Sequence, residues 1–100
     1  MGKVYMEAEL KRKFLYTIRF SNNEFINLQT VQAALQEEAD SNEIPVTFDT
    51  SSSVSSGSLL KPKFEDVLIL TNPENKGCFM LLIRIRTQGK HIFMDVYIVK

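Results

Sequence analysis

The side chains that could carry catalytic chemistry are few in this chain of 100 residues. His91 is the only histidine and Cys78 the only cysteine. A histidine that acts as a general base needs a carboxylate to orient it and a nucleophile within reach, whereas Asp95 lies four residues away along the chain. A reactive cysteine needs an electropositive setting, and Lys76 is the one cation close to Cys78 in the sequence. We therefore expect no catalytic residue and a buried, structural cysteine.

Carboxylates gather in one part of the chain, which raises the question of a metal site. They are Glu37, Glu38, Asp40, Glu43 and Asp49. Their spacing is not that of a calcium-binding loop. The sequence also lacks the Cys/His spacing of a zinc site, a glycine-rich phosphate loop and the serine motif of hydrolases. We expect solvated charge here, and neither a metal nor a cofactor.

Basic residues fall into two groups. The first is Lys11, Arg12 and Lys13 with Arg19, and the second is Arg84, Arg86 and Lys90. Twelve basic and twelve acidic side chains cancel over the whole chain, and this balance does not favour a dedicated nucleic-acid or membrane-surface binder. If one sheet face collected both groups together with aromatic rings, that face would suit single-stranded nucleic acid, which binds by stacking and charge.

The element most clearly predicted is a C-terminal β-hairpin over residues 77–100. Two apolar runs flank Gln88 and Gly89, which we expect to form a two-residue turn with Gly89 at positive φ. This turn predicts four facing apolar pairs on one side of the hairpin: Ile85 with Ile92, Ile83 with Met94, Leu81 with Val96, and Phe79 with Ile98. A shift by one residue would move the whole set to the other face, so the pattern indicates clearly which residues share a face of the hairpin.

Residues 3–20 alternate between apolar even positions and mostly polar odd ones, which is typical of a strand. Good helix formers occupy Met6 to Lys13, with Glu7 and Lys11 at helical spacing, so a helix competes with the strand there. We favour a strand throughout, most clearly for Phe14 to Phe20. The sequence does not indicate where this strand enters a sheet.

A helix is expected from about residue 22 to 40. Ser21 and Glu24 have the form of a capping box, and Asn27 is a possible later cap. The apolar residues that follow recur at helical spacing and form one stripe; they are Phe25, Leu28, Val31, Leu35 and Ala39. Ser41 and Asn42 are expected to end the helix before Pro45.

The middle of the chain predicts shorter strands. Ile44, Val46 and Phe48 alternate with polar residues, and residues 64–71 form a strand that is apolar on both faces and therefore internal in the sheet. Residues 50–58 are rich in serine, which indicates a flexible loop or a poorly held edge strand. The resulting order is β-α-β-β-β-β. We therefore expect an α+β fold in residues 1–100, a single domain built as a two-layer sandwich: one long helix packed on a mostly antiparallel sheet of four to five strands.

Composition places the chain among ordinary globular proteins, with 44% hydrophobic and 24% charged residues. A single cysteine allows no internal disulfide. The first 13 residues do not have the pattern of a signal peptide, and no apolar run approaches the roughly 18–20 residues of a membrane span. These features favour a cytoplasmic protein that does not act at a membrane.

The face of the hairpin opposite the apolar pairs is the predicted interaction surface. It carries apolar and charged side chains that either another part of the chain or a second protein must cover; the candidate residues are Met80, Leu82, Arg84, Phe93 and Tyr97. Arg84 is also placed for a diagonal cross-strand pair with Asp95. We expect a non-catalytic domain that acts through protein–protein contacts with itself, as a homodimer, or with another protein. Binding of single-stranded nucleic acid through the same face is the alternative.

Overall fold

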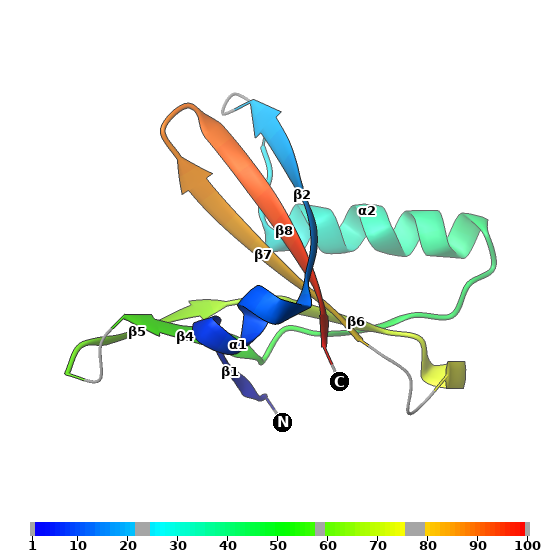
Figure 1. Cartoon of the computed structure of the whole chain (residues 1–100). Coiled ribbons are helices and arrows are strands. Elements are labelled where there is room, and N and C mark those ends of the chain that lie inside the picture. The colour runs from blue at the N-terminus through cyan, green and yellow to red at the C-terminus, as the bar shows by residue number, and fades with distance from the viewer. Residues whose placement is uncertain (1, 22–24, 58–59, 76–79, 100) are drawn as a thin grey trace.

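The computed structural model describes residues 2–21, 25–57, 60–75 and 80–99 (Figure 1). Its strands are β1 (Val4–Met6), β2 (Phe14–Ser21), β3 (Thr47–Asp49), β4 (Ser53–Gly57), β5 (Pro62–Asp66), β6 (Leu68–Thr71), β7 (Met80–Gln88) and β8 (His91–Val99). Its helices are α1 (Glu7–Leu10) and α2 (Leu28–Ser41), with short 3-10 segments η1 (Lys11–Lys13) and η2 (Pro73–Asn75).

The predicted fold class is wrong. The structure is mostly β, with 52% strand and 26% helix, and its strands form two sheets rather than one. A five-stranded antiparallel sheet has the order β2-β8-β7-β6-β3, and a three-stranded sheet has the order β1-β4-β5. The helices span only four and fourteen residues, so one long helix on a single sheet does not describe the chain.

The break between the two sheets lies at Val67. The sequence predicts one strand over residues 64–71, but residues 62–66 pair with β4 in the smaller sheet while residues 68–71 pair with β3 and β7 in the larger one. Val67 itself is fully buried. A run that is apolar on both faces can therefore be divided between two sheets. Periodicity alone does not distinguish this arrangement from one internal strand.

The C-terminal hairpin forms as an antiparallel pair, with a register two residues from the one expected. The turn residues are Gly89 and Lys90, and Gly89 has φ of 60°. The facing pairs are Ile85 with Met94, Ile83 with Val96, and Leu81 with Ile98. Because side chains alternate with a period of two, this even shift leaves every residue on its predicted face. The expected partner Phe79 lies outside the described residues.

In the N-terminal segment the competing helix prevails over the strand between residues 7 and 13, where α1 and η1 form. Local helix propensity and the turn into β2 outweigh the alternation there. Strand β2 forms as expected and occupies the edge of the larger sheet beside β8.

Helix α2 starts later than the main prediction, at the alternative cap Asn27. The Asn27 side chain accepts a hydrogen bond from the Thr30 amide, and the Thr30 hydroxyl accepts one from the Asn27 amide, each at 2.9 Å. Residues 25–27 are not helical, and Phe25 is 80% exposed. The expected cap residues 22–24 lie outside the described part of the chain.

Both faces of the larger sheet bury apolar residues. On one face Val31 of α2 packs with Leu68, Ile83 and Val96. On the other face the N-terminal segment and the smaller sheet cover the lower half of β7 and β8 (Figure 1); that core contains Tyr5, Leu10, Val54, Val67, Ile69, Leu82, Tyr97 and Val99. Helix α2 therefore packs on one face of the larger sheet, while the N-terminal segment and the smaller sheet cover only the lower part of the other face (Figure 1).

The serine-rich segment is the centre of the smaller sheet rather than a loop or an edge. Residues 53–57 form β4, which pairs with β1 on one side and β5 on the other. Its one apolar residue, Val54, is fully buried. Among the described helices, none combines the length and apolar character needed to cross a membrane.

Candidate functional site

Three of the five predicted interaction residues are covered by the chain itself. Leu82 is fully buried and Tyr97 is 7% exposed, and Met80 packs against the same core. The residues that cover this surface come from β1, α1 and β4, through Tyr5, Leu10 and Val54. The N-terminal segment and the serine-rich segment thus supply the cover that the apolar surface requires.

Arg84 lies at the junction of three segments and is neutralised by two carboxylates. Its Nη2 atom lies 2.8 Å from a carboxylate oxygen of Glu7 in α1, and its Nε donates to Glu65 of β5 at 2.6 Å. The Arg84 side chain is only 11% exposed. Burial lowers the pKa of Arg84, but hydrogen bonds to Glu7 and Glu65 outweigh it and raise the pKa above its ordinary value. Arg84 therefore joins the two sheets and has no free charge to offer a ligand.

Asp95 forms its ion pair with Arg86, whereas the sequence suggested Arg84 as its partner. Arg84 is directly opposite Asp95 in the ladder, and Arg86 reaches it diagonally with two hydrogen bonds. The Thr17 hydroxyl of β2 donates a third. Burial raises the pKa of Asp95, while these donors lower it, and the net pKa lies below the ordinary value. This network connects the three strands β2, β8 and β7.

Phe93, the fifth predicted residue, lies on the same face nearer the hairpin turn and is partly buried. The Arg86 guanidinium stacks over the Phe93 ring at 4.9 Å, and the His91 ring meets it edge-on at 6.2 Å. Arg19 of β2 is directly opposite Phe93. This part of the sheet therefore brings together aromatic and basic side chains from both sequence groups.

The five acidic residues of the sequence cluster are spread over helix α2, the residues after it and strand β3. Among the described residues, no three His, Cys, Asp or Glu side chains gather closely enough to hold an ion. Asp49 accepts hydrogen bonds from the Ser51 hydroxyl at 2.5 Å, the Ser52 hydroxyl at 2.7 Å and the Ser51 amide at 2.9 Å. These bonds lower the pKa of Asp49 to about 2. Since the Lys3 amide in turn donates to Ser52, Asp49 helps to hold the N-terminal segment. Cys78 lies outside the described residues.

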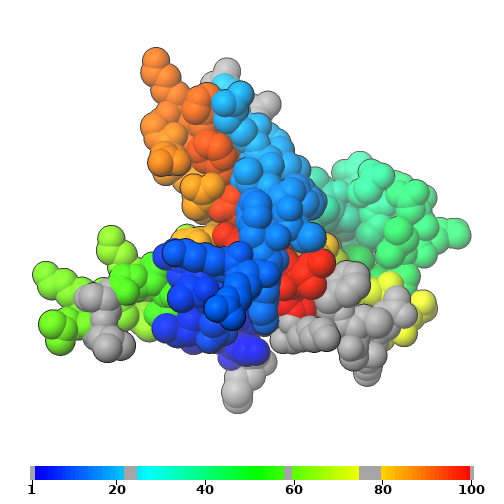
Figure 2. Space-filling model, in the orientation of Figure 1, coloured from blue at the N-terminus to red at the C-terminus, as the bar shows by residue number. Residues whose placement is uncertain are grey.

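The most exposed apolar strand is β2, which the sequence did not single out as a site. Four of its side chains are between 37% and 49% exposed; they are Phe14, Leu15, Tyr16 and Ile18. Figure 2 shows the strand as a continuous blue ridge from η1 to the top of the hairpin, with no other described segment in front of it. The alternation that predicted the strand could not indicate its edge position, because the same pattern suits an internal strand.

The other three sheet edges in the described structure are short or protected. Strands β1 and β3 have three residues each. Strand β5 has five residues and begins with Pro62 and Lys63, residues that natural proteins use to block edge pairing. Strand β2 has eight residues, no proline and one charged side chain, Arg19.

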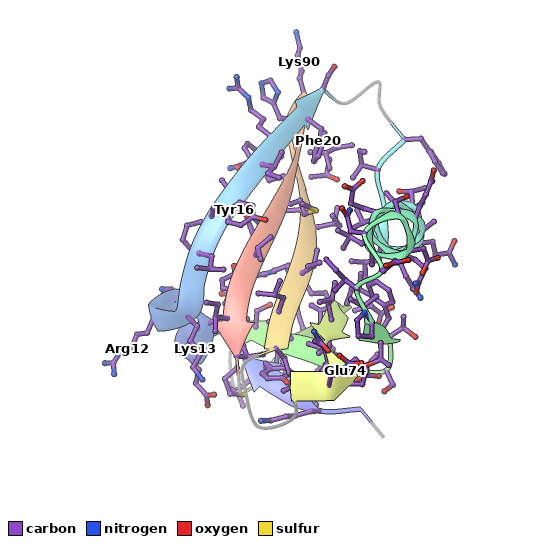
Figure 3. All side chains as sticks on the ribbon, turned by 90° about the vertical axis from the view of Figure 1, so that its right-hand side faces the viewer. Arg12, Lys13, Tyr16, Phe20, Glu74 and Lys90 are labelled. Atoms are coloured by element: carbon purple, nitrogen blue, oxygen red, sulfur yellow. The ribbon has the colours of Figure 1, made fainter. Side chains whose placement is uncertain are left out.

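An apolar groove of about 250 Å³ lies beside β2, between its sheet and helix α2. Its lining comes from the strands and from the helix and the residues just before it: Phe20, Ile26, Thr30, Val31, Ala34, Leu35 and Met94. Figure 3 looks nearly along α2 and shows the helix on one side of the sheet, with Tyr16 and Phe20 on β2. The open edge and the groove together form the candidate site, which we call the β2 edge surface.

No family model, no curated protein and no solved structure matches this chain.

Proposed function

We propose that this chain is a small non-catalytic domain that acts through protein–protein contacts, with the β2 edge surface as its contact site. The observation that carries the proposal is the contrast between β2 and the other three edges. An edge strand that is long and apolar can accept a further strand through its backbone groups, here along the regular stretch from Tyr16 to Phe20, and its side chains then give the contact specificity.

The contact site that we propose differs from the one predicted from the sequence. Leu82 and Tyr97 are already buried within the chain, so a partner does not need to cover them. A group of neighbouring exposed apolar side chains lies instead on β2, where Tyr16 and Ile18 are 49% and 37% exposed.

Purification of tagged chain from expressing cells after cross-linking tests the proposal. Three versions are compared: the wild type, Ile18→Lys, and Leu60→Lys as a control at an exposed leucine outside the surface. We expect Ile18→Lys to lose the bound proteins, including untagged copies of the chain, because a charge on the edge opposes strand pairing. The control is expected to retain them. The same bound set for all three versions would contradict the proposal.

Binding of single-stranded nucleic acid is a second candidate, supported by the cluster at Phe93. Arg86 stacks over this partly buried ring and Arg19 lies opposite it, and a base can stack beside such a pair while Arg19 contacts a phosphate. Fluorescence anisotropy with short oligonucleotides tests this candidate, with Phe93→Ala compared with Phe64→Ala, which changes a ring exposed on β5. Affinity that falls steeply with salt and is lost only in Phe93→Ala would support it.

A further inference from the structure

The side-chain pattern of β2 is symmetric about Ile18. Tyr16, Ile18 and Phe20 face α2, because they pair with Val96, Met94 and Ile92 of β8 on that side. Thr17 and Arg19 face the other way, opposite Asp95 and Phe93. The five residues therefore have the same order of apolar and polar positions in both chain directions.

A strand with this symmetry matches an antiparallel copy of itself. With a two-fold axis through Ile18, Ile18 lies opposite Ile18 of the second copy, and Tyr16 lies opposite Phe20 of the second copy. Thr17 then meets Arg19 of the second copy on the other face. Apolar side chains meet apolar ones in every pair on the helix side, as cross-strand pairing favours.

The other antiparallel registers of two β2 strands place less compatible side chains opposite each other. A shift by one residue places apolar side chains opposite polar ones. An axis through Arg19 places two like charges directly opposite each other. An axis through Thr17 brings Phe20 opposite Phe14 of the second copy, but the irregularity between Phe14 and Tyr16 turns Phe14 to the opposite face, where its ring contacts Tyr97.

The groove beside β2 suits the same arrangement. Phe20 lines this groove together with Ala34 and Leu35 of α2. Because Tyr16 of the second copy would lie next to Phe20 on the helix side of the sheet, its ring would be placed at the groove. The interface would then bury side chains as well as backbone groups, which a stable dimer requires.

The charges of the chain also complement a second copy. Residues 10–21 contain four basic and no acidic residues, while residues 28–49 contain five acidic and no basic ones. Helix α2 extends beyond β2 in Figure 1, on the side where a strand added to β2 would lie. In the dimer, the basic segments β2 and η1 of the second copy would therefore lie on the same side as the acidic end of α2 of the first copy.

We propose that the partner of the β2 edge surface is a second copy of this chain, paired antiparallel through β2 with Ile18 on the two-fold axis. The two larger sheets then form one continuous ten-stranded sheet with both α2 helices on the same face. The inference rests on the proposed contact at β2 and adds the identity of the partner and the register.

Light scattering and sedimentation over a range of concentrations test the partner. The wild type is expected to form a dimer that weakens as salt increases. Ile18→Lys is expected to raise the dissociation constant roughly tenfold or more, since it places two like charges opposite each other. Leu60→Lys, at a leucine that is 93% exposed and lies outside β2 and α2, is the control and should dimerise like the wild type.

Disulfide trapping tests the register, in a chain whose Cys78 is replaced by serine. Directly opposite residues have Cα atoms about 4.5–5.5 Å apart, a separation that a disulfide bridges. Ile18→Cys is therefore expected to cross-link rapidly on oxidation. Thr17→Cys should not, because its two copies would be roughly 8 Å apart.

The outcomes separate this inference from the proposed function. A strict monomer overturns the inference, and the function stands if Ile18→Lys still abolishes binding of another protein. A dimer that cross-links through Thr17→Cys instead of Ile18→Cys overturns the register. A dimer that Ile18→Lys leaves unchanged overturns both, because the contact is then not at β2.

Discussion

Arg86 donates two hydrogen bonds to Asp95 diagonally across the pair of strands β7 and β8. The Asp95 side chain is only 4% exposed, whereas that of Arg86 is 36% exposed. A buried carboxylate whose main partner is a single arginine makes the stability of the sheet sensitive to both mutation and acid.

Replacement of Asp95 by asparagine is expected to lower the free energy of unfolding by about 2–3 kcal/mol, because it breaks a largely buried ion pair and leaves Arg86 without its charged partner. Urea unfolding at neutral pH measures the effect. Thr17→Val, which removes only the hydroxyl that donates to Asp95, should cost less. An unchanged Asp95→Asn variant would contradict this account.

Acid is expected to weaken the fold through the same carboxylate and through Asp49. The pKa of Asp95 in the folded chain lies below its ordinary value, and that of Asp49 is about 2. Their contribution is therefore fully present above about pH 4, the ordinary pKa of aspartate, and is lost as the pH falls below it. Unfolding measured from pH 7 to pH 2 should show this loss, and Asp95→Asn should reduce it.

Replacement of Arg84 by methionine is expected to cost only about 1 kcal/mol, less than Asp95→Asn. The side chains of Glu7 and Glu65 are 42% and 36% exposed, so both carboxylates can return to water when the arginine is removed, and the methionine retains the apolar packing of the stem. Urea unfolding of both variants under the same conditions gives the comparison. A larger loss for Arg84→Met would show that Arg84 binds the two sheets together more strongly than its exposed partners suggest.

Leu82→Ala is expected to lower the free energy of unfolding by about 3 kcal/mol, the cost of a cavity in a packed core. Leu82 is fully buried under the N-terminal segment and β4. Leu15→Ala, at a leucine that is 45% exposed on β2, is the matched control and should change stability by less than about 0.5 kcal/mol. Equal, small effects at both sites would mean that the outer face is not covered in solution.

Two glycines at positive φ should differ in their tolerance of alanine. Gly89 has φ of 60° and open space where the Cβ of an alanine would lie, so Gly89→Ala is expected to cost only about 1 kcal/mol of backbone strain. At Gly57, with φ of 87°, a Cβ would lie 2.6 Å from the Lys61 carbonyl oxygen. Gly57→Ala should therefore be clearly the more destabilising change in thermal unfolding.

Local patterns in the sequence were sufficient for the elements that depend on near neighbours. The two apolar runs around Gly89 predict the hairpin and its two faces, because the alternation of side chains survives a register shift of two residues. The cap at Asn27 is a local hydrogen-bond pattern and could likewise be foreseen. The exact register of the hairpin could not be foreseen, because it depends on whether Gln88–Gly89 or Gly89–Lys90 forms the turn.

Contacts between distant segments could be decided only by the tertiary structure. The burial of Leu82 and Tyr97 depends on Tyr5, Leu10 and Val54, which lie far from them in the chain, and no periodicity indicates which segment covers a given face. The division of residues 62–71 between two sheets also depends on contacts between distant segments, and so does the edge position of β2. Burial is a property of the whole packed chain. The sequence could therefore show that an apolar face needs cover, but only the folded structure showed which segments cover it and that β2 stays exposed at the sheet edge.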